Sequence, residues 1–176
     1  MDEKFIAPCG MTCCDCLFRQ EKIYDAAKSL KVAFKDFEYD KFLLHFSKTN
    51  IPFFQDFNKL PEFLELLDKI IFLQCEKVCM EARGCSVPNA DKVFGGLVKE
   101  THKCDVLLCI ESKGYEGCWD CKELEICEKK KFFRFTYGNV PVENCALVRD
   151  SGKEAVQARG NKYYIWQQKD KTTKKE

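Results

Sequence analysis

Cysteine is the residue type with the most chemistry to offer in this sequence. The chain of 176 residues holds thirteen cysteines: four between residues 9 and 16, none between 17 and 74, eight between 75 and 127, and one at 145. Thiolates bind soft and borderline metal ions, attack electrophiles and form disulfides. Because the count is odd and the N-terminus lacks an export signal, we expect metal ligands or reactive thiols rather than a disulfide framework.

The spacing of three cysteines near residue 120 predicts a shared metal ion. Cys118 and Cys121 form a C-x-x-C pair, in which two thiolates can turn onto one ion, and Cys127 follows after five further residues. A helix through this segment would place Cys121, Leu124 and Cys127 on one side. Three thiolates that converge in this way are typical of a zinc site.

A second group, Cys9, Cys13 and Cys16, has C-x3-C-x2-C spacing directly after Pro8. Radical S-adenosylmethionine enzymes hold a [4Fe–4S] cluster with this spacing, but within a barrel for which this sequence offers neither strands nor length. The cysteine run of bacterial ferredoxins is also absent. The candidate ligands are soft thiolates, and the chain has only two histidines. Such ligands select zinc or an iron–sulfur cluster over hard cations, and zinc is the preferred prediction.

Two further pairs of cysteines could complete these sites. Cys104 and Cys109 are separated by four residues, and Cys75 and Cys79 lie near the end of a predicted helix. Spacing alone leaves open how the ligands divide among two or three sites. The predicted metal ligands are Cys9, Cys13, Cys16, Cys85, Cys104, Cys109, Cys118, Cys121 and Cys127.

The cysteines and histidines outside the predicted ligand set are mostly expected to pack in the fold. Cys14, Cys145 and Cys75 are expected to act as small apolar side chains, the commonest role of a free cysteine. His45 lies on a predicted apolar helix and is expected to pack there, while His102 is a weaker ligand candidate. No Ser-His-Asp or Cys-His arrangement is present, so the sequence predicts no particular reaction.

In order along the chain, these motifs resemble a cysteine-rich family of prokaryotic proteins classed only as a domain of unknown function. Its members open with a C-G-L-Y-C-x-x-C type motif, and the resemblance covers roughly residues 7 to 135. It implies metal binding and no established activity. The chain departs from the pattern before Cys85, where the family tends to show C-x-G-C but Ala82 stands first, and Cys79 is the candidate substitute. The segments that carry the resemblance are Ala7-Pro8-Cys9-Gly10-Met11-Thr12-Cys13-Cys14-Asp15-Cys16, Gly84-Cys85, Cys104, Cys109, Gly117-Cys118-Trp119-Asp120-Cys121 and Cys127.

Apolar periodicity predicts the elements that must position these cysteines. Apolar residues recur at three- and four-residue steps, which indicates amphipathic helices. No strand signal competes, so the expected fold is mainly α with little or no sheet. We expect one folding unit over residues 1–168 and a disordered polar tail over 169–176. The predicted helices cover 17–37, 39–46, about 61–71, 93–103, 105–113, 121–135, and a last one that begins with Asn139 as N-cap and ends near Gly160.

Composition limits the environment and the partners. There are 29 basic and 28 acidic side chains, which leaves no global field to attract nucleic acid or anionic lipid. No apolar run approaches the roughly 20 residues that span a bilayer, and we expect a cytoplasmic protein without a membrane segment.

Three classes of function remain open. The preferred hypothesis is a zinc-binding protein with structural metal that serves as an interaction module for an unidentified protein partner. The main rival is an iron–sulfur or thiol-redox protein or enzyme. A weaker rival is nucleic-acid binding through Lys129–Phe135, where basic and aromatic residues alternate; a helix end followed by core phenylalanines is the preferred interpretation of that run.

Overall fold

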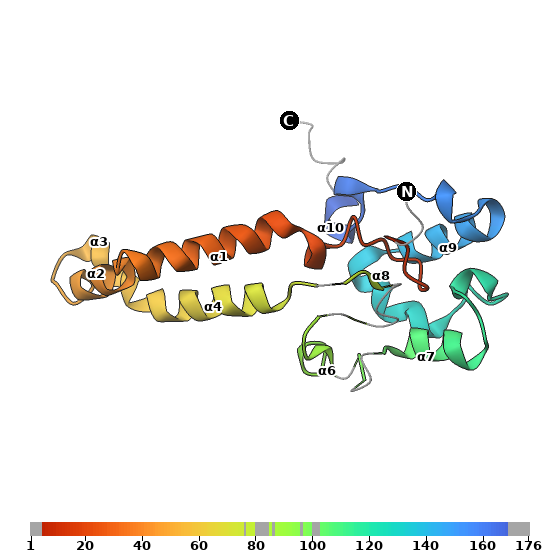
Figure 1. Ribbon diagram of the computed structural model, residues 1–176, viewed down its shortest axis with the longest axis horizontal. Helices are drawn as coiled ribbons and strands as arrows, with labels where there is room; N and C mark the ends of the chain where they lie inside the picture. Colours follow the sequence, from red (N-terminus) through yellow and green to blue (C-terminus); the bar gives the residue numbers. More distant parts are fainter. Residues whose placement is uncertain are drawn as a thin grey trace, which may run out of the picture. The chain divides into compact units, whose positions relative to one another are not determined.

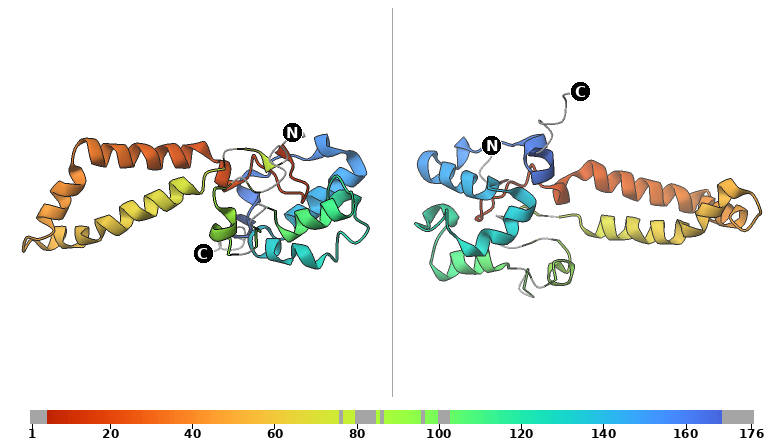
Figure 2. Two further views of the ribbon diagram at one scale, coloured as in Figure 1. Left: turned by 60° about the horizontal axis from the view of Figure 1, so that its bottom comes forward. Right: turned by 180° about the vertical axis from the view of Figure 1, so that it is seen from behind.

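The computed structural model describes residues 5–75, 77–79, 85, 87–95, 97–99 and 103–168, and these divide into two compact units. Unit 1 combines Met1–Arg19 with Cys75–Glu176, and unit 2 is Gln20–Gln74 (Figures 1 and 2). The fold is mainly helical, as predicted. Within the described ranges there is no strand; two isolated antiparallel bridges join Ile6 to Thr12 and Val98 to Cys104.

Unit 2 is a helical hairpin that holds none of the cysteines. Helices α1 and α4 lie side by side as its two arms, and α2, α3 and the 3₁₀ turn η3 form its tip (Figure 1). The predicted second and third helices are confirmed, and the first begins at Glu21 rather than at Leu17 because Leu17–Arg19 is a separate 3₁₀ turn, η2. The elements are α1 (Glu21–Asp36), α2 (Tyr39–Phe46), α3 (Pro52–Gln55), η3 (Asp56–Lys59) and α4 (Leu60–Phe72).

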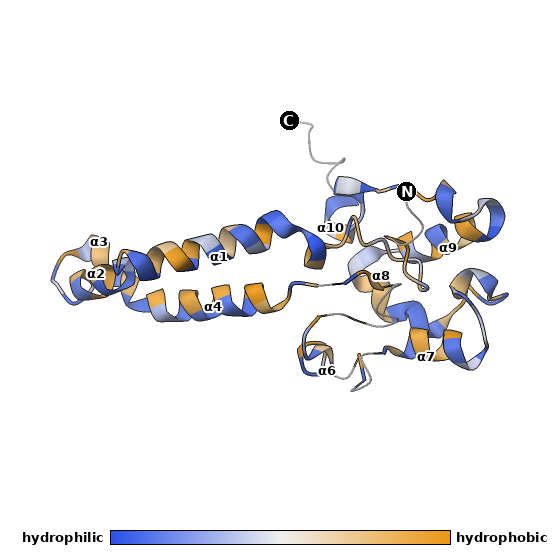
Figure 3. Ribbon diagram, in the orientation of Figure 1, coloured by the Kyte–Doolittle hydropathy of each residue, from blue (hydrophilic) through white to orange (hydrophobic). Residues whose placement is uncertain are grey.

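The apolar faces of α1 and α4 explain why the hairpin closes. Figure 3 shows apolar bands on both helices, and Tyr24, Ala27 and Leu67 are buried there. Across the arms, Lys31 forms an ion pair with Asp68, and the Lys28 ammonium donates to the Gln74 side chain at 2.7 Å. Apolar burial on one stripe therefore stabilises the pair, since exposed ion pairs contribute about 1 kcal/mol at most.

Unit 1 is built from short helices joined by turns. The predicted helix at 105–113 is confirmed as α7, and a helix does follow Asn139, although the Asn139 side chain makes no capping hydrogen bond. The described elements are η2, α6 (Ala90–Val93), α7 (Asp105–Ser112), η4 (Cys118–Asp120), η5 (Glu128–Lys130), α8 (Lys131–Tyr137), α9 (Val140–Ser151), η6 (Lys153–Ala155), η7 (Gly160–Lys162) and α10 (Ile165–Gln168).

Three predicted helix ranges in unit 1 are wrong. The chain from Cys121 to Cys127 is a series of turns, and helix α8 begins only at Lys131 because Cys121 and Cys127 both have extended ψ angles. In place of a helix over 93–103, Val98 pairs with Cys104. Helix α9 ends before Gly152, whose φ of 85° reverses the chain, rather than near Gly160.

The core of unit 1 packs the N-terminal segment against α7, α8 and α9. Ile6, Val106, Leu124 and Val156 are among its most deeply buried side chains. The single folding unit over residues 1–168 stays a prediction. The predicted polar tail lies outside the described residues.

Tyr163 fastens the N-terminal cysteine loop to the rest of unit 1. Its side chain is 0 % exposed, and its hydroxyl oxygen accepts a hydrogen bond from the Thr12 backbone N–H at 3.0 Å. Burial is the main cause that raises the pKa of Tyr163 above its usual range, so the hydroxyl stays protonated. One long-range bond therefore positions the backbone beside Cys13.

Removal of that hydroxyl should destabilise the protein measurably. Tyr163→Phe keeps the ring but leaves the Thr12 N–H buried without its partner, which costs about 1–3 kcal/mol. Tyr39→Phe is the matched control because Tyr39 is half-exposed and its ring contacts with Phe34 and Phe42 are kept. Denaturant unfolding of both variants measures the difference, and equal stability of the two would contradict this account.

Candidate metal centre

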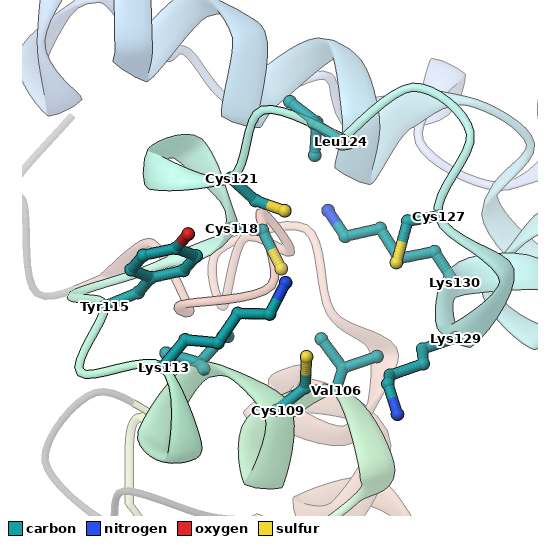
Figure 4. A pocket seen from close by; sticks show the side chains of 11 residues that line it. Val106, Cys109, Lys113, Tyr115, Cys118, Cys121, Leu124, Cys127, Lys129 and Lys130 are labelled. Carbon is teal, nitrogen blue, oxygen red and sulfur yellow. The ribbon is translucent and has the colours of Figure 1, made fainter.

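Four of the predicted ligand cysteines line one small cavity in unit 1. Its volume is about 30 Å³. Figure 4 shows the sulfur atoms of Cys109, Cys118, Cys121 and Cys127 around this space. The other lining residues are Val106, Ile110, Lys113, Tyr115, Leu124, Lys129 and Lys130. The space can hold one small ion or a water molecule, and it is far below the roughly 300–1,000 Å³ of pockets for organic ligands.

The backbone before Cys118 is fixed by several hydrogen bonds. Asp120 accepts from the N–H groups of Glu116 and Gly117 at 2.8 and 3.3 Å, and the Cys118 N–H donates to the Pro8 carbonyl at 2.7 Å. A Cβ at Gly117 would lie 2.4 Å from the Trp119 ring, so only glycine allows this close approach. The C-x-x-C pair is thus held in a tight 3₁₀ turn.

Cys109 comes from α7, and Cys121 and Cys127 stand at the two ends of the turn segment. Between them Leu124 is buried in the core and anchors the segment. The prediction that Cys121, Leu124 and Cys127 share one side of a helix is wrong. The two cysteines nevertheless line one cavity, because the turns fold the chain around Leu124.

Two lysines contribute positive charge to the cavity. Lys130 is 1 % exposed, and its ammonium donates to the Cys9 carbonyl at 3.0 Å and to Cys145 Sγ at 3.3 Å. Lys113 extends among the sulfurs in Figure 4, and its pKa is raised by Cys121 first and then by Cys109. Both side chains are therefore expected to be charged at neutral pH.

Cys118 is poised to be a thiolate. A hydrogen bond from the Cys145 thiol lowers the pKa of Cys118 to about 7, against the opposing effect of burial and with help from Lys130. The donor, Cys145, has its pKa raised by the same hydrogen bond and by burial. For Lys130, burial lowers the pKa, but nearby Cys145 and Cys118 outweigh that effect and leave it raised. Cys145 and Lys130 together stabilise the negative charge on the Cys118 sulfur.

The donor set fits a thiophilic divalent ion. Four thiolates around a dication leave two negative charges, and Lys113 and Lys130 supply two positive ones, so the centre would be neutral overall. As the side chains stand, no group of three or more His, Cys, Asp or Glu in the described ranges is already arranged to hold a metal ion. The thiols would have to turn about their side-chain torsions to meet an ion.

The other predicted ligands lie apart from this cavity. Cys9, Cys13 and Cys16 belong to the N-terminal segment; burial is the largest cause that raises the pKa of Cys9 and of Cys16 to about 12. Cys104 is the N-cap residue of α7 and pairs with Val98, and Cys85 is half-buried and close enough to Cys104 for the two to interact. None of these five lines the cavity.

Several residues have roles that differ from the sequence interpretation. Cys145 is fully buried but bonds Lys130 and Cys118 rather than serving as plain filler. Cys14 is exposed, and so is His45, which contradicts the packing predicted for both. His102 lies outside the described residues. In the sequence, Lys130 stands out only as part of the basic run, and such a run predicts solvent exposure rather than a buried lysine beside cysteines.

The basic and aromatic run at Lys129–Phe135 is divided between the core and the surface of unit 1. Lys130 and Phe133 are buried in unit 1, whereas Phe135 is 87 % exposed. The preferred interpretation, a solvated helix end followed by core phenylalanines, is confirmed for Phe133 but wrong for buried Lys130 and exposed Phe135. Among the helices that the structure describes, none is long and apolar enough to cross a membrane.

A comparison with known protein families matches nearly the same residues as the motif resemblance. No curated protein and no solved structure is similar enough to match. Residues 5–132 match the profile of one family, which is most of the chain and nearly the range over which the cysteine motifs are ordered. The chain therefore belongs to the family described as "Protein of unknown function (DUF3795)".

Proposed function

We propose that this protein binds a structural zinc ion through Cys109, Cys118, Cys121 and Cys127 and acts as an interaction module. The observation that carries the proposal is the convergence of these four thiols, from α7, η4 and the turn segment, on one cavity of about 30 Å³. Structural zinc sites take four protein ligands in a closed shell, commonly with a C-x-x-C knuckle.

Zinc is preferred over an iron–sulfur cluster on grounds of size. A cavity that holds a single ion or water molecule has no room for four irons and four sulfides, whereas a lone zinc needs only that the thiols turn inward. The ammonium groups of Lys113 and Lys130 would stabilise the two negative charges that four thiolates leave around either group, so charge does not separate the two. The small cavity argues against an organic substrate at the ion.

Thiol-redox chemistry is the second candidate, because the Cys145 thiol bonds Cys118 and lowers its pKa. A redox cysteine must also be reached by its substrate. Cys118 is 7 % exposed and Cys145 is 0 % exposed. Burial therefore argues against a redox role for this pair and favours a metal-binding role for Cys118.

The central test is the metal content of Cys121→Ser. Protein purified without oxygen should be colourless and contain zinc, and Cys121→Ser should lose one zinc per chain because a serine hydroxyl is a poor ligand for zinc beside thiolates. Cys14→Ser is the control, since Cys14 is exposed and away from the cavity. Metal analysis by mass spectrometry decides the matter. A brown protein, or equal zinc in Cys121→Ser and wild type, would overturn the proposal.

Cobalt substitution separates a structural site from a catalytic one. In a closed shell of four thiolates the ion binds no water, so the cobalt spectrum should show tetrahedral thiolate bands that neither small anions nor pH near neutrality alters. Spectral sensitivity to azide or to pH would indicate an open position and would move the proposal to an enzyme.

A further inference from the structure

A row of exposed apolar side chains lies along both arms of the hairpin in unit 2. The arms close along a seam that buries Tyr24 and Ala27 from α1 and Leu60 and Leu67 from α4. Beside this seam, five large apolar side chains remain between 38 and 55 % exposed. We call them the apolar face, and they are Ile23, Leu30, Phe63, Leu66 and Ile70.

These five side chains lie on the same side of the hairpin. Ile23 directly precedes Tyr24 of the seam, and Leu66 directly precedes Leu67. Consecutive residues of an α-helix are turned by about 100° around its axis. Because α1 and α4 run in opposite directions (Figure 1), the residue before a seam residue points to the same side in both arms. The other three members likewise precede half-buried side chains: Lys31, Leu64 and Ile71.

Unit 2 buries little apolar surface by itself. Of Gln20–Gln74, only five residues are buried, and they are Tyr24, Ala27, Leu43, Leu60 and Leu67. Helices in proteins obtain most of their stability from the packing of an amphipathic face, and a unit of this size has a marginal core. The apolar face is therefore a surface that gains stability when another apolar surface covers it.

Charges on the outer sides of the two arms indicate what covers it. Lys22 and Asp36 lie on the side of α1 away from the seam, two seven-residue steps apart, and Glu62 and Lys69 are one such step apart on α4. The base of the hairpin, where α1 begins and α4 ends, thus carries the two lysines. The tip carries the two acids. This pattern is complementary to itself when a copy is turned end for end.

We propose that two copies of this chain bind each other through their apolar faces, as an antiparallel four-helix arrangement with a two-fold axis. The base of each hairpin then lies over the tip of the other, so that Lys22 comes close to Asp36 of the partner subunit. An isologous contact of this kind buries the same residues on both copies, and four helices around a shared apolar core are a stable architecture.

A second copy explains the charge pattern better than an unrelated protein does. A foreign helix requires only complementary charges on itself, whereas the change of sign from base to tip is what self-association in this orientation requires. The proposal goes beyond the zinc site and does not rest on it, because unit 2 holds no cysteine.

Sedimentation of the full chain over a concentration series tests the contact. Wild-type protein should form a species of twice the 20.5 kDa chain mass. Leu66→Glu should weaken association by at least about tenfold, because the dimer would bury a carboxylate without a partner. Val32→Glu is the matched control: Val32 is 56 % exposed against 55 % for Leu66, but it follows Lys31 and so faces the opposite side.

Circular dichroism and metal analysis show whether each variant keeps the helix and metal content of the wild type. A wild-type protein that stays monomeric throughout the series would overturn the second copy and leave the face to a different protein. Leu66→Glu that dimerises as tightly as the wild type would overturn the role of the apolar face. Equal weakening in Val32→Glu would do the same.

Charge exchange tests the orientation. Lys69 also pairs with Glu65 of its own helix, so Lys22 and Asp36 are the residues to change. Lys22→Glu should weaken the dimer because acid then faces acid at two places, and the double variant Lys22→Glu with Asp36→Lys should regain the lost association. Sedimentation measures all three proteins. A tighter dimer in Lys22→Glu, or no recovery in the double variant, would overturn the antiparallel arrangement.

Discussion

Chelation of zinc from the wild-type protein should unfold the turn region of unit 1. Between Ser112 and Lys131 the described chain has only the 3₁₀ turns η4 and η5, so few backbone hydrogen bonds hold it. Binding of structural zinc in small peptides contributes on the order of 10–16 kcal/mol that is linked to folding. That is comparable to the roughly 5–15 kcal/mol by which whole domains are stable.

Hydrogen exchange with and without a chelator measures this effect segment by segment. Exchange over residues 105–137 should accelerate by several orders of magnitude, while the α1 and α4 arms should lose much less protection, because unit 2 holds no cysteine and closes through apolar contact. Restoring zinc should restore protection. Unchanged exchange over 105–137 in protein shown to be metal-free would contradict a structural role for the ion.

Gly10→Ala should be among the most damaging single substitutions in the chain. Gly10 has a φ of 88°, and a Cβ there would lie 2.2 Å from the Pro141 carbonyl oxygen and 2.5 Å from Cys145 Sγ. The left-handed conformation costs roughly 1 kcal/mol for alanine, and overpacking against backbone adds roughly 1–3 kcal/mol. The Gly10 carbonyl also accepts from the Asn144 amide at 2.9 Å, so the loop cannot shift without breaking a buried bond.

Gly114→Ala separates the cost of the left-handed conformation from the cost of overpacking. Gly114 has a φ of 65°, but nothing lies within 4 Å of the Cβ position, so its replacement should cost only the conformational part. We expect Gly10→Ala to lower the free energy of unfolding by about 2–4 kcal/mol and Gly114→Ala by about 1 kcal/mol. Denaturant titration of both variants provides the comparison. Equal losses would mean that α9 moves away from the N-terminal loop at little cost.

The sequence predicts local features well where one short segment decides them. The three- and four-residue spacing of apolar side chains in Tyr39–Phe46 and Leu60–Phe72 predicts a helix from one short segment, and the same holds for α7. Cysteine content likewise indicates thiolate chemistry without reference to the fold. The helical class and the candidate ligand types therefore follow from the sequence alone.

Where the thiols and their charged neighbours meet depends on packing. Spacing placed Cys121 and Cys127 on a helix, but buried Leu124 draws the chain into turns that bring them to the same cavity. The run around Lys130 resembled a solvated surface, yet its ammonium is buried on the Cys9 carbonyl and Cys145.

The division of the cysteines into two groups was also beyond the sequence. Cys109, Cys118, Cys121 and Cys127 line the cavity, whereas the other predicted ligands do not, and no local pattern in the sequence separates the two sets. Helical periodicity can be recognised within a short stretch of consecutive residues. Which cysteines can share a metal ion depends instead on contacts between segments that are distant along the chain. The sequence by itself thus determined the helices and the chemistry of the thiols, and the tertiary structure decided which thiols can share an ion.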